Sequence, residues 1–145
     1  MHGQLTNTIR IEIPGNPIPK GRPRFGNGRT YTPKRTKTFE DSVGLYARSA
    51  MAGELPYDAP MDMRAVFVFE PPKSWSKKKR QAAMDGLVFC TSGGDLDNLQ
   101  KAVADSLNGI VYVDDRQIIS AHVSKAYGPT AGTIVELTPI IVRAA

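Results

Sequence analysis

Four of the five aspartates between positions 95 and 115 of the chain form two closely spaced pairs: Asp95 with Asp97, and Asp114 with Asp115. Carboxylates about 4 Å apart repel by roughly 4 kcal/mol per pair at an effective dielectric near 20. A fold gathers such groups only around an opposite charge, and hard oxygen ligands favour Mg²⁺, or Mn²⁺, over zinc or copper. Because Mg²⁺ held by a few carboxylates most often acts on phosphates, this stretch predicts metal-dependent chemistry at a phosphate.

The first pair stands where a helix is expected to begin. Taken alone, Asp95 is most simply an N-cap and Asp97 a first-turn acid favoured by the helix dipole. Leu99 and Val103 mark the buried face of this helix, which leaves Asp97 and Lys101 as neighbours on another face. Their pairing could be only a surface salt bridge. A lysine among acids can also neutralise charge on a phosphoryl oxygen or orient an attacking water.

The second pair follows a four-residue apolar run at residues 110–113. This run predicts a short strand, reached by a tight Asn-Gly turn, that returns beside the helix. The return would carry Asp114 or Asp115 toward the start of the helix. Because neighbouring strand residues point to opposite faces, only one of the two is expected in the site.

Other elements are predicted from the spacing of apolar residues. Alternation predicts strands at 8–14, 61–70, 118–127 and 133–142, the last two as a hairpin joined by G-P-T-A-G. Helical spacing predicts a helix from Thr36 or Thr38 to Met51, and Ser74 or Ser76 can cap a short helix that stops at Gly86.

The composition fits one domain spanning residues 1–145, with a single cysteine and no zinc-like Cys/His spacing. The first residues lack the apolar run of a signal peptide, and no apolar stretch approaches the roughly 20 residues that span a bilayer. We therefore expect a cytoplasmic protein with no membrane partner. The net charge of +5 is unevenly spread. Residues 1–50 carry nine Lys/Arg against three acids, whereas residues 95–145 carry four against six.

A Pro- and Gly-rich loop at 15–38 holds most of the basic residues of the first half, interleaved with two aromatics, Phe25 and Tyr31. The simplest interpretation is a solvated loop. The alternative is an arm that contacts DNA phosphates, with aromatics available to stack on bases. Its candidate DNA-binding residues are Lys20, Arg22, Arg24, Arg29, Lys34, Arg35 and Lys37.

The motifs D-L-D-N-L-Q-K-A at 95–102, D-S-L-N-G and V-Y-V-D-D-R-Q-I closely resemble those of the RusA family of Holliday-junction resolvases. Members of that family are endodeoxyribonucleases often carried by phages and prophages. The segments I-P-G-N-P-I-P-K-G-R-P-R-F and R-T-Y-T-P-K-R-T-K-T-F-E look like the amino-terminal half of the same family. The resemblance spans roughly residues 9–142.

The resemblance implies an α+β fold with a single mixed sheet of about five strands and two to three helices. It also implies a homodimer that acts on branched DNA in the cytoplasm of a bacterial host, with Mg²⁺ and no small-molecule cofactor. Carried over by motif, Asp95, Asp97 and Asp115 are metal-binding and catalytic, and Lys101 is the essential lysine. Asp114 is then the spare acid. Hydrolysis of this type leaves a 5′-phosphate and a 3′-hydroxyl.

One departure from the family pattern concerns the residues before the first aspartate. Family members often have a basic residue there, where this chain has Gly93-Gly94. The run Lys77 to Arg80, otherwise a solvated face, or Arg116 could replace that phosphate contact.

Three alternatives stay open from the residues alone. A non-catalytic DNA-binding module explains the basic loop but not the acids. A nuclease of the same chemistry could prefer flaps or forks. A D-x-D nucleotide-sugar enzyme shares the acid pair, but the chain is small for that class and shows no nucleotide-binding domain.

Overall fold

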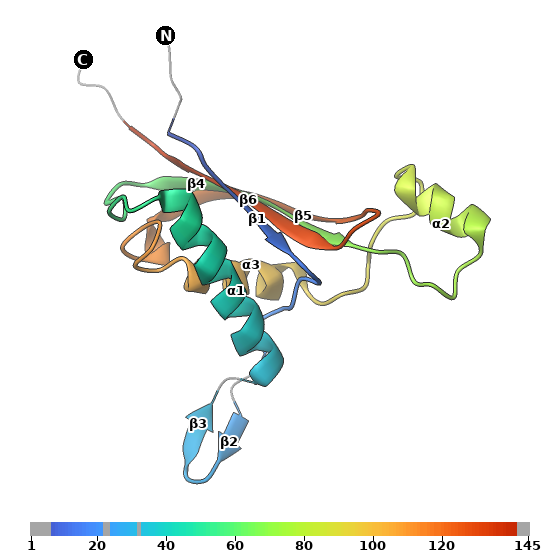
Figure 1. Cartoon of the computed structure of the whole chain (residues 1–145), viewed down its shortest axis with the longest axis horizontal. Coiled ribbons are helices and arrows are strands. Elements are labelled where there is room, and N and C mark those ends of the chain that lie inside the picture. The colour runs from blue at the N-terminus through green and yellow to red at the C-terminus, as the bar shows by residue number, and fades with distance from the viewer. Residues whose placement is uncertain (1–6, 22–23, 32, 142–145) are drawn as a thin grey trace.

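The computed structural model describes residues 7–21, 24–31 and 33–141, and its centre is a four-stranded mixed sheet (Figure 1). The strands lie in the order β1-β6-β4-β5, where β1 is Ile9–Pro14, β4 is Met61–Phe69, β5 is Ile118–Tyr127 and β6 is Gly132–Pro139. The β1/β6 and β6/β4 pairs are antiparallel, and β4/β5 is parallel. The predicted α+β class and mixed sheet are confirmed.

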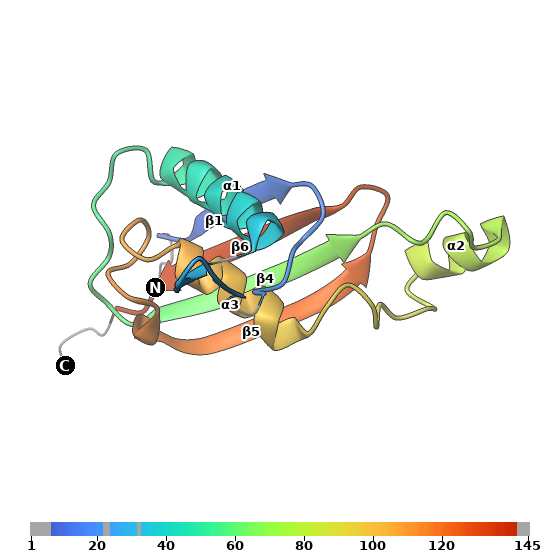
Figure 2. The ribbon, with the colours of Figure 1, turned by 90° about the horizontal axis from the view of Figure 1, so that it is seen from below.

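Three α-helices occur in the described residues: α1 (Lys34–Met51), α2 (Lys77–Met84) and α3 (Leu96–Ser106). Helices α1 and α3 lie side by side on one face of the sheet (Figures 1 and 2). None of the helices in this part of the chain is both long and apolar enough to cross a bilayer.

The core lies between the sheet and these two helices. Ile11 and Ile13 of β1 are buried while Arg10 and Glu12 between them are exposed, which is the alternation the sequence predicts. On α3, Leu99 and other apolar residues are fully buried, and each such side chain contributes about 1.5–3 kcal/mol. The packing therefore holds α3 firmly against the sheet. The other fully buried residues of the two helices are Val43, Ala47, Ala102 and Val103.

The predicted hairpin of residues 118–127 and 133–142 is wrong, because β4 lies between β5 and β6 and pairs with both. Met63 and Phe67 of β4 are completely buried on the helix side, and Val66 and Val68 are half-buried on the other. A strand with apolar residues on both faces suits the centre of a sheet. Strand β4 therefore occupies the place beside β6 that the predicted hairpin assigned to β5.

The strand predicted at residues 110–113 is also wrong, and the segment is a compact turn. Gly109 N–H donates to the Tyr112 carbonyl over 2.8 Å, which closes the turn. Tyr112 is fully buried, and its hydroxyl donates to the Ala104 carbonyl over 2.6 Å. A short apolar run is ambiguous in sequence, and here burial of the Tyr112 ring against the end of α3 decides its conformation.

The loop predicted at 15–38 is in fact three pieces. Residues 15–21 form an extended segment, β2 (Arg24–Gly26) and β3 (Arg29–Tyr31) form a two-stranded hairpin, and α1 already begins at Lys34. Figure 1 shows that this hairpin and α2 both stand away from the body of the molecule, in different directions.

Candidate active site

The side chains of Asp95 and Asp97 are exposed at the start of α3. Asp95 occupies the N-cap position with extended backbone, yet its carboxylate makes no capping hydrogen bond. Asp97 lies in the first turn, and neither residue has a side-chain hydrogen bond or ion pair within the described part of the chain. Capping therefore does not account for the Asp95 carboxylate, which is available to a ligand.

The two glycines before Asp95 allow the backbone to pack closely. Both have positive φ, +90° at Gly93 and +104° at Gly94. A Cβ at Gly93 would lie 2.6 Å from the ring of Phe69, and one at Gly94 would lie 2.7 Å from Pro19 Cγ. The close approach and the positive φ together explain why both positions are glycine.

Lys125 of β5 supplies a cation to this segment. Its Nζ donates to the carbonyl oxygens of Ser92 at 3.1 Å and Gly94 at 2.9 Å. The ammonium group thus lies beside the residue that precedes Asp95, where the sequence lacks a basic residue. The replacement of the missing phosphate contact by the run at 77–80 or by Arg116 stays a prediction.

For the endodeoxyribonuclease activity that the sequence predicts, Lys125→Met is expected to slow cleavage about tenfold to a hundredfold, the usual effect of losing a group that orients a metal ligand. The two charge-assisted hydrogen bonds that hold residues 92–94 would be lost. The measurement is the single-turnover rate at saturating protein, with affinity measured separately in EDTA. Lys125→Arg keeps the charge and should recover much of the rate. A Lys125→Met variant that cuts at the wild-type rate would contradict this role.

Lys20 ties the amino-terminal segment to α3. Its backbone N–H donates to the Asn98 carbonyl over 2.9 Å, and its Nζ lies 2.6 Å from Glu40 and 3.5 Å from Asp105. Burial alone would lower the pKa of Lys20, but the hydrogen bond to Glu40 and the charges of Glu40 and Asp105 raise it above its usual value. Lys20 was predicted as a DNA contact, and the structure places it among acids, only half-buried.

The two adjacent aspartates after the turn have different surroundings. Asp114 caps the 3₁₀-helix η1 (Asp115–Gln117): its carboxylate accepts from Arg116 N–H over 3.0 Å, and its own N–H donates to the Gln117 side chain over 2.8 Å. Asp115 instead lies within hydrogen-bonding reach of Asp105. That hydrogen bond, burial and nearby negative charges raise the pKa of Asp115, while Lys101 opposes the shift.

The structure thus assembles two acidic groups along one helix. Asp95 and Asp97 lie at its start, whereas Asp115 lies beside Asp105, which is about 12 Å further along the axis than Asp97 at 1.5 Å per residue. Lys101 is one turn from both Asp97 and Asp105, and its Nζ is 3.7 Å from Asp105. Within residues 7–21, 24–31 and 33–141, no three acidic, histidine or cysteine side chains are gathered closely enough to bind one metal ion.

The donor chemistry nevertheless fits a hard divalent cation. The available ligands are carboxylate oxygens, and the negative charges of Asp105 and Asp114 beside Asp115 are only partly offset by Lys101. A cation would offset them further. The predicted return of the chain toward the helix start is only partly realised, because the turn at 108–113 brings Asp115 to the second half of α3.

Comparison with known proteins decides the family. The model of the family described as Endodeoxyribonuclease RusA matches residues 14–138, which is most of the chain. The chain belongs to the RusA endodeoxyribonuclease family. A protein of Bacillus subtilis (strain 168), the uncharacterized protein YqaN, is 39% identical to it over 126 residues, covering 82% of this chain and 87% of that protein.

The basic residues predicted to bind DNA lie in several places of this RusA chain. Arg22 and the side chain of Arg24 lie outside the described part. Arg29 is exposed on the hairpin, and Lys34, Arg35 and Lys37 are exposed on the first turns of α1. Lys37 Nζ pairs with Asp41 at 3.0 Å, an exposed contact worth a few tenths of a kcal/mol, so it remains available to a polyanion.

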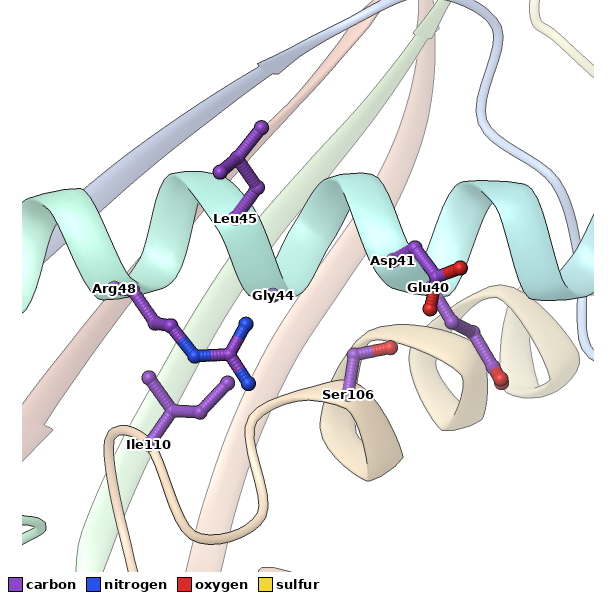
Figure 3. A pocket seen from close by; sticks show the side chains of 7 residues that line it. All are labelled: Glu40, Asp41, Gly44, Leu45, Arg48, Ser106 and Ile110. Carbon is purple, nitrogen blue, oxygen red and sulfur yellow. The ribbon is translucent and has the colours of Figure 1, made fainter.

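A groove of about 500 Å³ between α1 and the end of α3 contains none of the predicted metal ligands (Figure 3). Figure 3 shows Arg48 reaching from α1 toward Ile110 at one end, and Glu40 pointing toward α3 at the other. Asp95, Asp97 and Lys101 of α3 do not line this groove, so it is not the candidate active site. Sequence reasoning missed Lys125 and undervalued Asp105, whose spacing from Lys101 was the one available signal.

Proposed function

We propose that this RusA-family chain is a Mg²⁺-dependent, structure-selective endodeoxyribonuclease that resolves four-way DNA junctions by paired nicks in recombination and repair. The observation that carries the proposal is family membership over residues 14–138, combined with exposed, uncommitted carboxylates at the start of α3. A module that only binds DNA gives no reason for Asp95 and Asp97 to lack hydrogen-bond and ion-pair partners among the described residues.

In this proposal Asp95, Asp97 and Asp115 hold one or two Mg²⁺ ions, for which Mn²⁺ can substitute. When bound, the ion lowers the pKa of a water and polarises the scissile phosphate. Lys101 stabilises negative charge on the phosphoryl oxygens. Lys125 orients the backbone just before Asp95, and Asp105 with Lys20 keeps Asp115 facing α3.

A homodimer suits the proposed substrate. A four-way junction has near-twofold symmetry and must be cut in two strands, so two centres related by a dimer axis match the task. Arg29, Lys34 and Arg35 would contact the DNA backbone with salt-dependent affinity and little sequence information.

The experiment that tests the proposal compares a synthetic four-way junction with a linear duplex of the same sequence, each with Mg²⁺ or EDTA. We expect paired nicks in the junction alone, and only with Mg²⁺. Equal cutting of both substrates would indicate a general nuclease, and preference for a flap or fork a different branched substrate. Binding without cutting in any metal would favour the DNA-binding module.

Mg²⁺ is also expected to stabilise the fold in a pH-dependent way. The folded-state pKa of Asp115 is raised above its usual 3.8, so the stability this group contributes at low pH is lost as pH rises through the folded pKa. A cation bound beside Asp115 would offset the negative charges that raise this pKa. At pH 7.5 and tenfold above its dissociation constant, Mg²⁺ should raise Tm by about 4 °C.

The check is thermal unfolding followed by circular dichroism in EDTA and in Mg²⁺, at pH 7.5 and at pH 4. The metal-induced shift should shrink at pH 4, where protons compete for the carboxylates, and should be largely lost in Asp115→Asn. An equal shift at both pH values would contradict an ion bound by Asp115.

A further inference from the structure

The segment between buried Pro71 and buried Cys90 leaves the body of the protein and returns to it, and residues 72–89 are here called the arm. Figures 1 and 2 show α2, the helix of the arm, beyond the end of the sheet and clear of α1 and α3. Of the eight residues of α2, only Ala83 is buried. The arm therefore contributes little to the core.

The arm is nevertheless fixed where it leaves the body. The Trp75 ring meets Tyr127 of β5 edge-on, with centroids 5.5 Å apart, and Lys79 Nζ lies 4.0 Å from the centre of the Trp75 ring. Ser76 caps α2 by accepting a hydrogen bond from Lys79 N–H over 3.2 Å. These contacts hold the helix in a defined position outside the core, as an element that presents a surface.

The surface of the arm is cationic. Lys77 and Lys78 are exposed and have no ion pair among the described residues, and the first turn of α2 holds no acid. Acids stabilise a first helical turn and lysines do not, so helix stability does not explain these cations. The arm carries five basic residues against one acid, Asp85, whose carboxylate accepts from Gln81 over 2.9 Å.

Two large apolar side chains lie on the return path of the arm toward Asp95. Leu87 is 75% exposed and Phe89 is 81% exposed. Exposed lysines and an exposed aromatic are the kinds of side chain that bind a nucleic-acid backbone and an unstacked base. An axial length of about 12 Å for eight helical residues spans roughly three phosphates of one strand.

We propose that the arm is a second DNA-binding element, separate from the basic residues of the amino-terminal half. Lys77 and Lys78 contact the backbone of the DNA duplex that leads away from the cleavage point. Phe89 stacks on a base that is unpaired at the branch point of the junction. This rests on the proposed function for its substrate. Charge complementarity favours DNA over a second copy of the chain, whose arm would carry the same positive charge.

The test measures binding of a four-way junction and of a linear duplex in EDTA, across a series of salt concentrations. For Lys77→Ala/Lys78→Ala, the slope of log affinity against log salt should fall by about two, at roughly 0.9 per phosphate contact. Phe89→Ala should weaken junction binding about tenfold and leave duplex binding unchanged. The matched controls are Arg48→Ala/Arg64→Ala, which removes two exposed cations elsewhere, and Leu55→Ala, which removes an exposed apolar side chain.

An unchanged salt slope in Lys77→Ala/Lys78→Ala, or the same change in the arginine control, would overturn the proposal. So would sedimentation showing that these variants convert a dimer into a monomer, because the surface would then belong to a second copy. Failure of the proposed function gives a different result. A wild-type protein that binds DNA with the expected salt slope but never cuts it would refute the proposed nuclease activity, and the proposal that the arm binds DNA would still hold.

Discussion

Asp115→Asn is expected to lower junction cleavage about a thousandfold, while Asp114→Asn leaves it almost unchanged. A loss of this size is typical when one principal catalytic group is removed. The neighbours differ in what they contact: Asp114 caps η1, whereas Asp115 faces Asp105 and Lys101. The measurement is the single-turnover rate of nicking with saturating protein and Mg²⁺.

The stability of these variants separates a catalytic effect from misfolding. Asp115→Asn removes a negative charge beside Asp105, so in EDTA at neutral pH its Tm should equal or exceed that of the wild type. Asparagine is also a good N-cap, so Asp114→Asn should fold normally, and Asp114→Ala should lose about 1 kcal/mol. Full cleavage by Asp115→Asn together with loss in Asp114→Asn would reverse the assignment.

Lys101→Met is expected to slow cleavage about a hundredfold with little change in DNA affinity. The Lys101 side chain is 61% exposed, and its ion pair with Asp105 at 3.7 Å adds little to the free energy of unfolding. The main effect of Lys101 should be to stabilise the negative charge that develops on the phosphoryl oxygens during cleavage. The measurements are the single-turnover rate with Mg²⁺ and the dissociation constant of the junction in EDTA.

Two further variants test the specificity of that result. Lys101→Arg keeps the positive charge and should retain part of the rate, and Arg48→Met removes an exposed cation of α1 outside the proposed centre, with no expected effect. A Lys101→Met protein that lost affinity in proportion to its rate would show that Lys101 only binds DNA.

Local patterns predicted the parts of the protein that depend on near neighbours in sequence. Helix α3 was predicted with the correct buried face because Leu99 and Val103 recur at helical spacing, and that periodicity also placed Asp97 and Lys101 on the opposite side. The four strands of the mixed sheet were predicted from alternation. Their order was not, because the central place of β4 depends on competition among all strands for partners.

The candidate site was predictable where a motif carries it and not where distant segments meet. Lys125 reaches the carbonyls of Ser92 and Gly94 from a strand some thirty positions away in sequence. Lys20 meets Asp105 from the other end of the chain. A contact between separate elements leaves no period or spacing in the sequence, so Lys125 was missed and Lys20 was predicted only as a DNA contact. The turn at 108–113 was misjudged because burial of Tyr112 outweighs strand propensity.

The docking of residues 15–21 on α3 matters for how related genes are interpreted. Pro19 packs on Gly94, and Lys20 joins Glu40 and Asp105, so a stretch that contains no proposed metal ligand completes the surroundings of those that are. A gene fragment whose product began at residue 22 would retain the whole D-L-D-N motif and would still encode an incomplete enzyme. Recognising the motif alone is therefore not enough to count a shortened relative as a working nuclease.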